Sequence, residues 1–209
     1  MVAVPKRRRW IGKVFIATSI DGYIARADGD IEWLTEGATA SGHAPAAVRV
    51  PAGMDYDSHM GSVDHLVMGR KTYDKVCTFD FWPYPDHRVW VLSQNPHEAL
   101  REDDRVSVVG SVTEAVSALN TANARGVYVD GGKVVQAFYA AGLIDEWVIT
   151  RVPIILGSGL PLFATLPHST RLVHLDSIAA AGGMVTSHYR VCNDHSCGSI
   201  EEYDDDRNA

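Results

Sequence analysis

Residues 127–142 read VYVDGGKVVQAFYAAG, and this stretch decides the predicted fold. Its first residues are β-branched or aromatic, Gly131 and Gly132 follow, and the later apolar residues recur at helical spacing until Gly142. The pattern is typical of a strand that turns sharply into a helix. The first N–H groups of a helix have no partner within it, so a glycine pair there lets a pyrophosphate approach the backbone. A plain tight turn is the alternative interpretation of the same two glycines.

Two other predicted strand ends carry groups that suit a phosphate. Residues 69–72 (GRKT) follow the apolar run at 65–68 and place two cations and a hydroxyl where a helix is predicted to begin. Ser93 follows another strand-like run at residues 88–92. In an open α/β sheet, ligands bind beyond the carboxyl ends of the strands. Three such ends therefore predict a nucleotide site.

Strand and helix patterns alternate along most of the chain. We predict strands over residues 10–20, 65–68, 88–92, 106–109, 127–129, 146–155, 171–177 and 184–191. We predict helices over residues 54–60, from about 72, from a capping box at 111–114 (SVTE) to about 123, and from 132 to 142. The strand at 10–20 should be central and buried, and the last two strands should form a hairpin across 179–183. This order predicts an α/β fold with a mostly parallel central sheet, an antiparallel C-terminal edge and flanking helices.

The bulk composition is that of an ordinary globular protein. The chain has 209 residues, 46% hydrophobic and 22% charged, so we expect a single domain over 1–209, with a core at about 10–192 and a flexible acidic tail at 193–209. The formal net charge of −7 disfavours nucleic acid and anionic membranes as partners, although residues 6–9 (KRRR) form one basic patch. No apolar run approaches the ~20 residues that span a bilayer. The segment at 35–53, rich in small residues, predicts a lid or a disordered insertion.

The cysteines and histidines favour neither a disulfide scaffold nor a metal enzyme. Three cysteines leave one unpaired in any disulfide scheme, so we expect a reducing cytoplasm. Cys192, His195 and Cys197 are a weak zinc signature because they supply three ligands in a hydrophilic C-terminal stretch. No metalloprotease or hydrolase motif is present, and we expect no metal site.

Four stretches together resemble the dihydrofolate-reductase-like superfamily. They are residues 16–25 (IATSIDGYIA), 68–73 (MGRKTY), 127–146 and 153–163 (PIILGSGLPLF). The pattern is most similar to the branch that contains the C-terminal reductase domain of the bifunctional riboflavin-biosynthesis deaminase/reductase, and it covers residues 14–191. The resemblance implies a three-layer αβα fold, a small-molecule substrate, NADPH as cofactor and a homodimer.

The resemblance also implies which residues bind the cofactor. Ala17 and Ile24 would flank the nicotinamide ring. The 2′-phosphate and pyrophosphate would be held by Gly69, Arg70, Lys71 and Thr72, with help from Ser93 and Gln94. Main-chain amides of a second group would bind the pyrophosphate, namely Gly131, Gly132, Lys133, Val134 and Val135. Asp130 stands where the riboflavin branch commonly has a glutamate, and turn stabilisation is its simpler role.

The substrate side departs from the pterin-reducing members of the superfamily. Trp33 matches their tryptophan and is the substrate-binding candidate, but Ala38 replaces the acid that they carry five residues later. Asp57, on the predicted helix at 54–60, is the catalytic candidate. Alternative acids are Asp55, Asp30 and Glu32, each of which is also a plausible solvated surface carboxylate, and Asp21 is expected only to shape a turn.

The function implied is hydride transfer from NADPH to a C=N or C=O bond of a small heterocyclic substrate, as in the riboflavin-pathway pyrimidine reductase. The missing acid after Trp33 disfavours the alternative of a dihydrofolate or pterin reductase. A nucleotide-binding protein without turnover is a third interpretation, since it would keep the glycines and Arg70 while lacking a proton donor.

Overall fold

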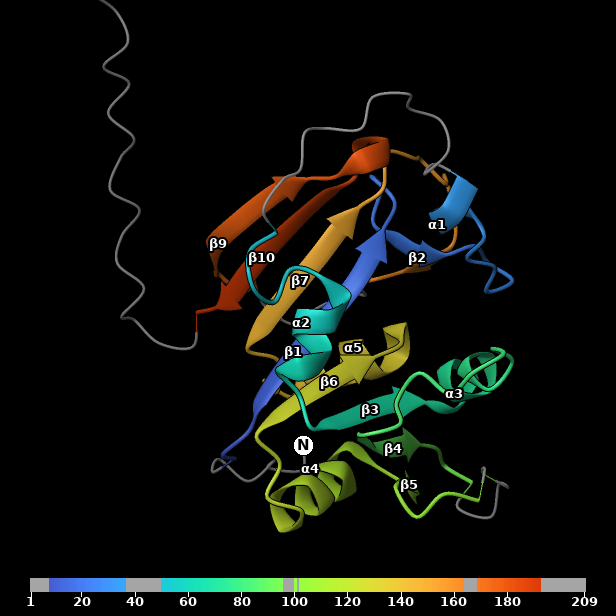
Figure 1. The fold of residues 1–209 in the computed structure, drawn as a ribbon, viewed down its shortest axis with the longest axis vertical. Helices are drawn as coiled ribbons and strands as arrows, with labels where there is room; N and C mark the ends of the chain where they lie inside the picture. Colours follow the sequence, from blue (N-terminus) through green and yellow to red (C-terminus); the bar gives the residue numbers. More distant parts are fainter. Residues whose placement is uncertain (1–7, 37–49, 96–99, 101, 164–168, 193–209) are drawn as a thin grey trace, which may run out of the picture.

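A single large sheet organises the chain in the computed structural model, which describes residues 8–36, 50–95, 100, 102–163 and 169–192. Within these residues the eight strands lie in the order β5-β4-β3-β6-β1-β7-β10-β9 (Figure 1). The strands are β1 (Ile11–Thr18), β3 (His65–Gly69), β4 (Arg88–Leu92), β5 (Val106–Val109), β6 (Gly126–Asp130), β7 (Glu146–Arg151), β9 (Leu172–Ala179) and β10 (Val185–Val191). A separate two-stranded ribbon pairs β2 (Tyr23–Ala25) with β8 (Leu160–Pro161).

The first six strands of the order are parallel, and β10 alone runs antiparallel to both of its neighbours within the described residues. The carboxyl ends of these parallel strands therefore lie along one edge of the sheet. The short helix α1 (Trp33–Glu36), the strand β2 and the helix α3 (Arg70–Val76) all lie toward this edge (Figure 1). The predicted mostly parallel sheet with an antiparallel C-terminal edge is confirmed.

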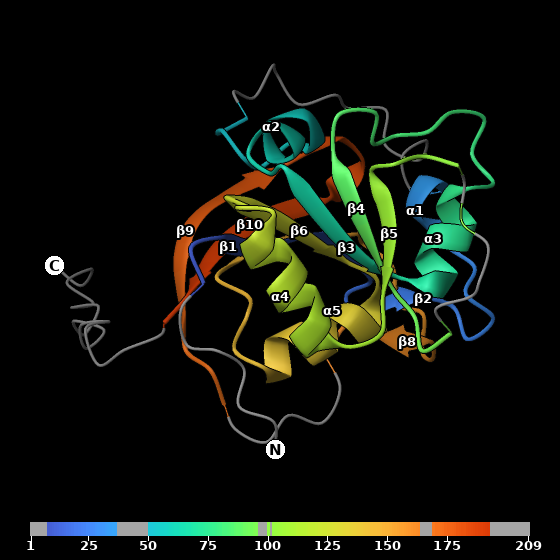
Figure 2. The same cartoon turned by 90° about the horizontal axis from the view of Figure 1, so that it is seen from below.

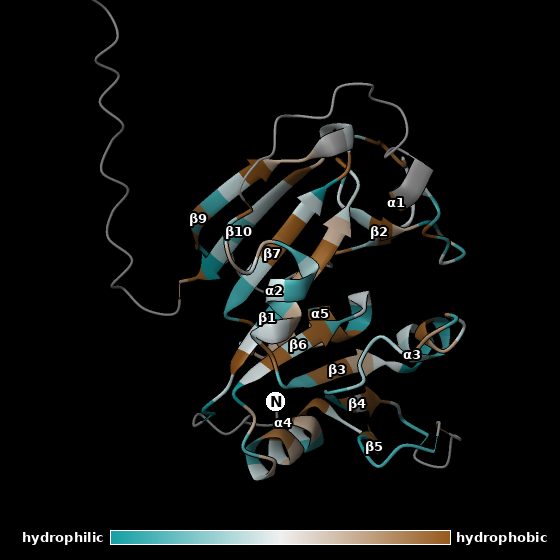
Figure 3. Ribbon diagram, in the orientation of Figure 1, coloured by the Kyte–Doolittle hydropathy of each residue, from teal (hydrophilic) through white to brown (hydrophobic). Residues whose placement is uncertain are grey.

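Helices cover both faces of the sheet. Helices α4 (Val112–Thr121) and α5 (Gly132–Ala140) pack on one face, while α2 (Tyr56–Gly61) lies on the other (Figure 2). Two apolar cores result: one joins α4 and α5 to the sheet, and the other joins α2 and α3 to it. Figure 3 shows brown, hydrophobic segments in the central strands and more teal along β9 and β10. The sheet is thus the middle layer of three.

Several element boundaries differ from the prediction. Strand β1 ends at Thr18 rather than at residue 20, because the Ser19 N–H bonds to the Tyr23 carbonyl and the chain turns. Strand β7 ends at Arg151 rather than at 155, since Pro153 has no N–H to continue a ladder. Strand β1 is central as predicted, but only alternate residues are buried, because Lys13 and its neighbours on the α2 face keep partial solvent contact.

The predicted capping box forms in part. Ser111 is the N-cap of α4, and its hydroxyl accepts the Glu114 N–H at 3.1 Å. The Glu114 carboxylate accepts the N–H of Gly110 at 2.8 Å instead of that of Ser111. The hairpin between β9 and β10 is present and turns through a 3₁₀ segment, η2 (Ala181–Gly183). Most of the 35–53 segment and all of the 193–209 tail lie outside the described residues, as do His195 and Cys197.

Candidate cofactor and substrate site

Three segments that are distant in the sequence meet at the carboxyl edge of the sheet. Gly131 has a φ of +84°, and a Cβ added there would collide with the Thr72 side chain. A Cβ on Gly132 would lie 2.6 Å from Cδ1 of Ile24, too close for any real contact. The turn between β6 and α5 therefore packs against both α3 and β2. Glycine is required at Gly131 by its positive φ, whereas a Cβ on Gly132 would displace the end of the Ile24 side chain.

The start of α5 leaves backbone donors available. Its N-cap residue, Gly131, makes no side-chain capping bond, and the Gly131 N–H donates to the Asp130 carboxyl group at 2.8 Å. The following amides of the first turn have no partner within the helix and point toward the same edge. Val134 is buried in the core, so it can bind a ligand only through its main chain. The prediction for Val135 is wrong, because its N–H already donates to the Gly131 carbonyl at 2.9 Å. This arrangement suits a pyrophosphate held by N–H groups and the helix dipole.

The strand ends beside it supply cations and a hydroxyl. Gly69 is paired with Leu92 at the ends of β3 and β4, so Ser93 follows directly beside the start of α3. Arg70 donates from Nε to Asp74 at 2.8 Å, and its guanidinium carbon lies 5.7 Å from the centre of the Tyr73 ring. The exposed residues at this edge, Lys71, Lys133 and Gln94, extend into solvent.

The nicotinamide candidates lie on the neighbouring strand and ribbon. Ala17 is half-buried on β1, opposite Thr150 of β7, and Ile24 of β2 lies against Gly132. Asp21 accepts the N–H groups of Leu156 and Gly157 at 3.1 and 2.7 Å, which fastens the 153–163 stretch to the β1–β2 turn. Asp21 thus has the turn-shaping role expected of it.

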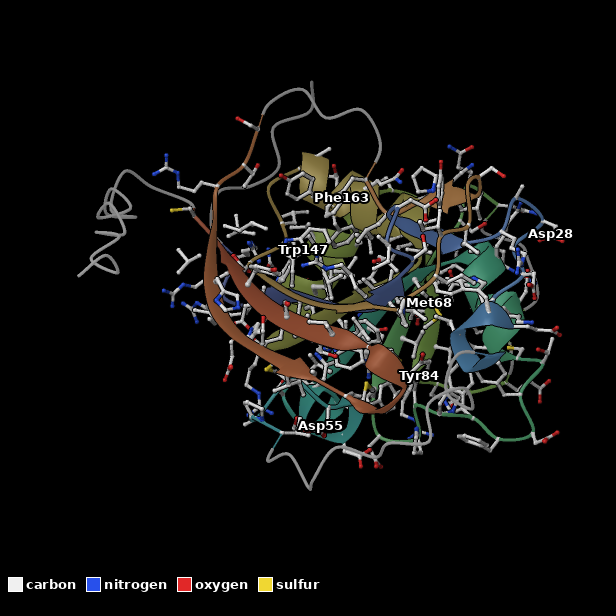
Figure 4. All side chains as sticks on the ribbon, turned by 90° about the horizontal axis from the view of Figure 1, so that it is seen from above. Asp28, Asp55, Met68, Tyr84, Trp147 and Phe163 are labelled. Carbon is white, nitrogen blue, oxygen red and sulfur yellow. The ribbon has the colours of Figure 1, made fainter. Side chains whose placement is uncertain are left out.

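Asp130, a partly buried acid, and three tyrosines lie around the end of β6. Burial raises the pKa of the Asp130 carboxyl group, and this effect outweighs the hydrogen bonds from the Gly131 N–H and from Tyr128, which lower it. Burial and then the nearby Asp130 raise the pKa of Tyr128, Tyr84 and Tyr56. Tyr84 and Tyr56 also share a hydrogen bond. In Figure 4 Tyr84 and Asp55 lie on one side of the sheet and Trp147 and Phe163 on the other, so this cluster belongs to the α2 side.

The comparisons with known proteins agree with this geometry. A family model described as the RibD C-terminal domain matches residues 12–186. The chain belongs to the RibD C-terminal domain family. The uncharacterized protein YwjB of Bacillus subtilis (strain 168) is 34% identical over 182 residues, which cover 84% of this chain and 95% of that protein.

Solved structures of similar fold agree with this family assignment. A putative riboflavin biosynthesis protein from Shewanella sp. PV-4 is 38% identical, with a TM-score of 0.73, and the match covers 87% of this chain and 99% of that one. RibD of Acinetobacter baumannii, at 16% identity and a TM-score of 0.64, supports the fold alone, and this chain spans 58% of its length. The architecture is therefore the three-layer, dihydrofolate-reductase-like fold of RibD C-terminal domains, and the predicted resemblance is confirmed.

The substrate-side candidates are scattered rather than gathered. Asp57 is exposed on the first turn of α2, outside the group of tyrosines around Asp130. Trp33 is 1% exposed, and its indole N–H has no partner among the described residues. Asp55 caps α2 by accepting the Ser58 N–H at 2.8 Å, so its carboxylate has a structural role. Ala38 lies outside the described residues.

The remaining acids also sit at the surface. Asp30 pairs with Arg26 at 3.3 Å, and Glu32 is exposed. Among the acids, Asp130 is the one that the fold surrounds with tyrosines. The sequence shows that it lies directly between a buried strand and the glycine pair. It does not show that Tyr56 of α2 and Tyr84 of the loop before β4 lie nearby. In the described part of the chain, no three His, Cys, Asp or Glu residues are grouped to hold a metal ion. No described helix has the length and apolarity needed to cross a bilayer.

Proposed function

We propose that this chain is an NADPH-dependent reductase that transfers a hydride to a C=N or C=O bond of a small heterocyclic substrate. The observation that carries the proposal is the convergence of the β3, β4 and β6 ends. Uncapped amides and cations meet there around Gly131, which has to be glycine because of its positive φ. The dinucleotide, when bound, supplies the hydride. The residues of the chain hold and orient it: the amides of 132–134 toward the pyrophosphate, Arg70 and Ser93 toward the 2′-phosphate, and Ala17 and Ile24 beside the ring.

Asp130 is the proton donor in this proposal. Burial raises the pKa of Asp130, and this effect outweighs the hydrogen bonds from the Gly131 N–H and from Tyr128, which lower it. The Tyr128 hydroxyl also donates to the Phe15 carbonyl at 2.9 Å. A partly buried acid with a raised pKa, placed next to the glycine pair, suits protonation of the atom that gains charge during reduction.

The substrate class follows from the family. A Thermotoga maritima protein of similar fold, 16% identical with a TM-score of 0.61, is a diaminohydroxyphosphoribosylaminopyrimidine deaminase and 5-amino-6-(5-phosphoribosylamino)uracil reductase. A pyrimidine-type substrate similar to the one in that name fits this chain better than a pterin, because the tryptophan-associated acid of the pterin reductases is absent. Asp57 stays an alternative acid, and its exposure is the argument against it.

The first test is a fluorescence titration of the purified protein with NADPH and NADH. We expect saturable binding that favours NADPH. In Arg70→Ala, loss of a charge-assisted contact of about 1.5–3 kcal/mol weakens NADPH by roughly tenfold to a hundredfold and leaves NADH nearly unchanged. Arg125→Ala is the matched control, since it removes the same charge from an exposed position at the amino end of β6.

Absence of binding at millimolar NADPH would overturn the assignment. Binding without NADPH oxidation in the presence of pyrimidine, pteridine and carbonyl substrates would instead identify a nucleotide-binding protein without turnover. Equal loss of NADPH affinity in Arg70→Ala and Arg125→Ala would remove Arg70 from the 2′-phosphate site.

We also propose that the protein is a cytoplasmic, single-domain homodimer. Apolar side chains on the two antiparallel strands, Leu172, Leu175 and Val185, are 37–41% exposed, and Ile155 near the 153–163 stretch is 73% exposed. Such surface is typical of an interface. Sedimentation of the wild type and Leu175→Glu tests this: a dimer that dissociates in the variant supports the proposal, and a monomeric wild type contradicts it.

A further inference from the structure

A cavity of about 200 Å³ lies under α2, away from the carboxyl edge. Its walls come from the turn before α2, from α2 itself and from β1, β7 and β10. The polar side chains in its lining are Lys13, Ser58, His59, Ser62, Glu146 and His188. Lys13 and Glu146 are paired in register near the amino ends of β1 and β7, so the cavity opens at the opposite half of these strands from Ala17 and Thr150. None of the proposed cofactor residues lines it.

Two imidazoles in these walls have an unsatisfied nitrogen. His59 is 2% exposed, its ring packs between Phe15 and Tyr128, and its Nε2 has no partner in the described residues. His188 faces it from β10, and its Nε2 is likewise unpartnered there, with the nearest Glu146 oxygen at 3.7 Å. A buried polar atom without a hydrogen bond loses its hydration and gains nothing in return, which destabilises the fold. Two such atoms in the walls of one cavity point to a ligand that satisfies them.

The charges around the cavity identify the kind of ligand. The Lys13 ammonium lies 3.3 Å from the Glu146 carboxylate and 3.2 Å from the Ser62 hydroxyl. The cavity is therefore lined by three basic side chains, Lys13, His59 and His188, and by one carboxylate, that of Glu146. Burial, and then the positive charges of Lys13 and His188, lower the pKa of His59 to about 4. The electrostatic potential at His59 is therefore positive. An anion bound there would be attracted, and it would raise the pKa of the imidazole and so favour its protonated form.

The groups that face His59 come from every element packed on it. They are Lys13 and Phe15 of β1, Tyr128 of β6, and His188 of β10, with Glu146 of β7 beyond Lys13. Asp55, on the turn that begins α2, is already engaged by the Ser58 hydroxyl and N–H. Glu146 is the one acid in the cavity lining, and its charge is offset by Lys13.

We infer that this cavity is a second binding site, separate from the cofactor edge, for a small monocarboxylate that bonds to the imidazoles of His59 and His188 beside Lys13. The volume equals about six or seven water molecules, at ~30 Å³ each, which accommodates a carboxylate of a few carbon atoms. Binding takes up a proton, because the carboxylate stabilises imidazolium against burial. The site therefore fills more readily at lower pH.

The probe is sodium propionate, with uncharged propionamide as its isostere. Carbon–proton correlation spectra of the histidine Cε1–H groups are followed from pH 4 to 8 at constant ionic strength. We expect saturable shifts at His59 and His188 with propionate, a rise of more than one unit in the pKa of His59 at saturation, and weaker binding at pH 8 than at pH 5. Propionamide should produce no saturable shift.

Variants separate the site from the proposed reductase function. Lys13→Met should weaken propionate at least tenfold, and His59→Phe should abolish its binding while NADPH affinity stays at the wild-type value. His174→Phe is the matched control, because His174 is exposed on β9 and bonds to Ser177. Propionamide binding as tight as propionate, no response at His59, or an equal effect of His174→Phe would each overturn the inference. Loss of NADPH binding in the wild type would affect only the proposed function.

Discussion

The carboxyl edge of the sheet and the cavity under α2 are lined by different kinds of groups. The edge presents main-chain amides around Gly131 and Gly132, where a Cβ would meet the side chains of Thr72 and Ile24. The cavity is lined by ionisable side chains, chiefly Lys13, His59 and His188, around an otherwise ordinary backbone. Ligand binding to main-chain amides should depend on steric fit and little on pH, whereas binding to ionisable side chains should depend on pH. The two proposals together give one fold two ligand sites that respond to different changes.

The largest effect should come from Gly132→Asp, which changes the proposed cofactor site at the carboxyl edge and leaves the cavity under α2 intact. A Cβ at this position meets Ile24, and the added carboxylate repels a pyrophosphate at the helix start. We expect NADPH affinity to fall by more than a hundredfold, measured by fluorescence titration, with unchanged propionate shifts at His59. Ser58→Asp, a matched acidic change at the cavity, should leave NADPH binding intact. Wild-type NADPH affinity in Gly132→Asp would mean that the helix start does not bind the pyrophosphate.

Asp130→Asn tests whether Asp130 acts in the chemical step rather than in cofactor binding. Loss of a general acid typically costs about 10²–10⁴ in rate, so kcat should fall by that factor while the dissociation constant of NADPH changes little. Because the pKa of Asp130 is raised in the folded chain, its ionisation reduces stability as pH increases through the folded-state value. Asn, which cannot ionise, should therefore stabilise the chain more at pH 8 than at pH 4.

Two measurements check this prediction, namely single-turnover kinetics and denaturant unfolding at pH 4 and 8. Asp57→Asn is the control, since that carboxylate is exposed and should behave as wild type. A full loss of activity in Asp57→Asn with normal turnover in Asp130→Asn would exchange the roles of the two acids.

The smallest effect is a pH dependence confined to the cavity. The pKa of His59 is lowered from 6.5 to about 4, so the unfolded chain binds more protons between these values and stability is lost as pH falls through them. The loss is about 3 kcal/mol at complete protonation. His59→Phe should remove this part of the acid sensitivity, measured by urea unfolding at pH 4.5 and 7.5. An unchanged pH slope in His59→Phe, with His174→Phe as control, would contradict the depressed pKa.

The same contrast explains which parts of the structure could be predicted from the sequence. Strand, glycine pair and helix follow each other directly at 127–142, so the edge is a local pattern, and the fold class and the family were predictable. Gly69 and Thr72 are likewise placed by the short run GRKT. The cavity brings together Lys13, His59 and His188 from three distant elements, and no short pattern links them.

Asp130 lies between these cases. Its position before the glycines is visible in the sequence, but its raised pKa comes from burial, which tertiary packing creates. Boundaries differ from the prediction where one contact decides them, as at Ser19, whose N–H bonds to the Tyr23 carbonyl. Ala38, which stands at the position of the pterin reductases' acid, lies outside the described residues, so the substrate acid stays a prediction.

The central position of β1 has a consequence for how the chain acquires its structure. Ile11 pairs with Gly126 and Lys13 with Glu146, so β1 is synthesised well before these partners, which follow more than a hundred residues later. At ~5–20 residues per second, this interval lasts roughly 6–27 s. Contacts of such high sequence separation slow folding, and the waiting apolar strand is exposed to association with other chains. Chaperone demand during synthesis should therefore be set by β1.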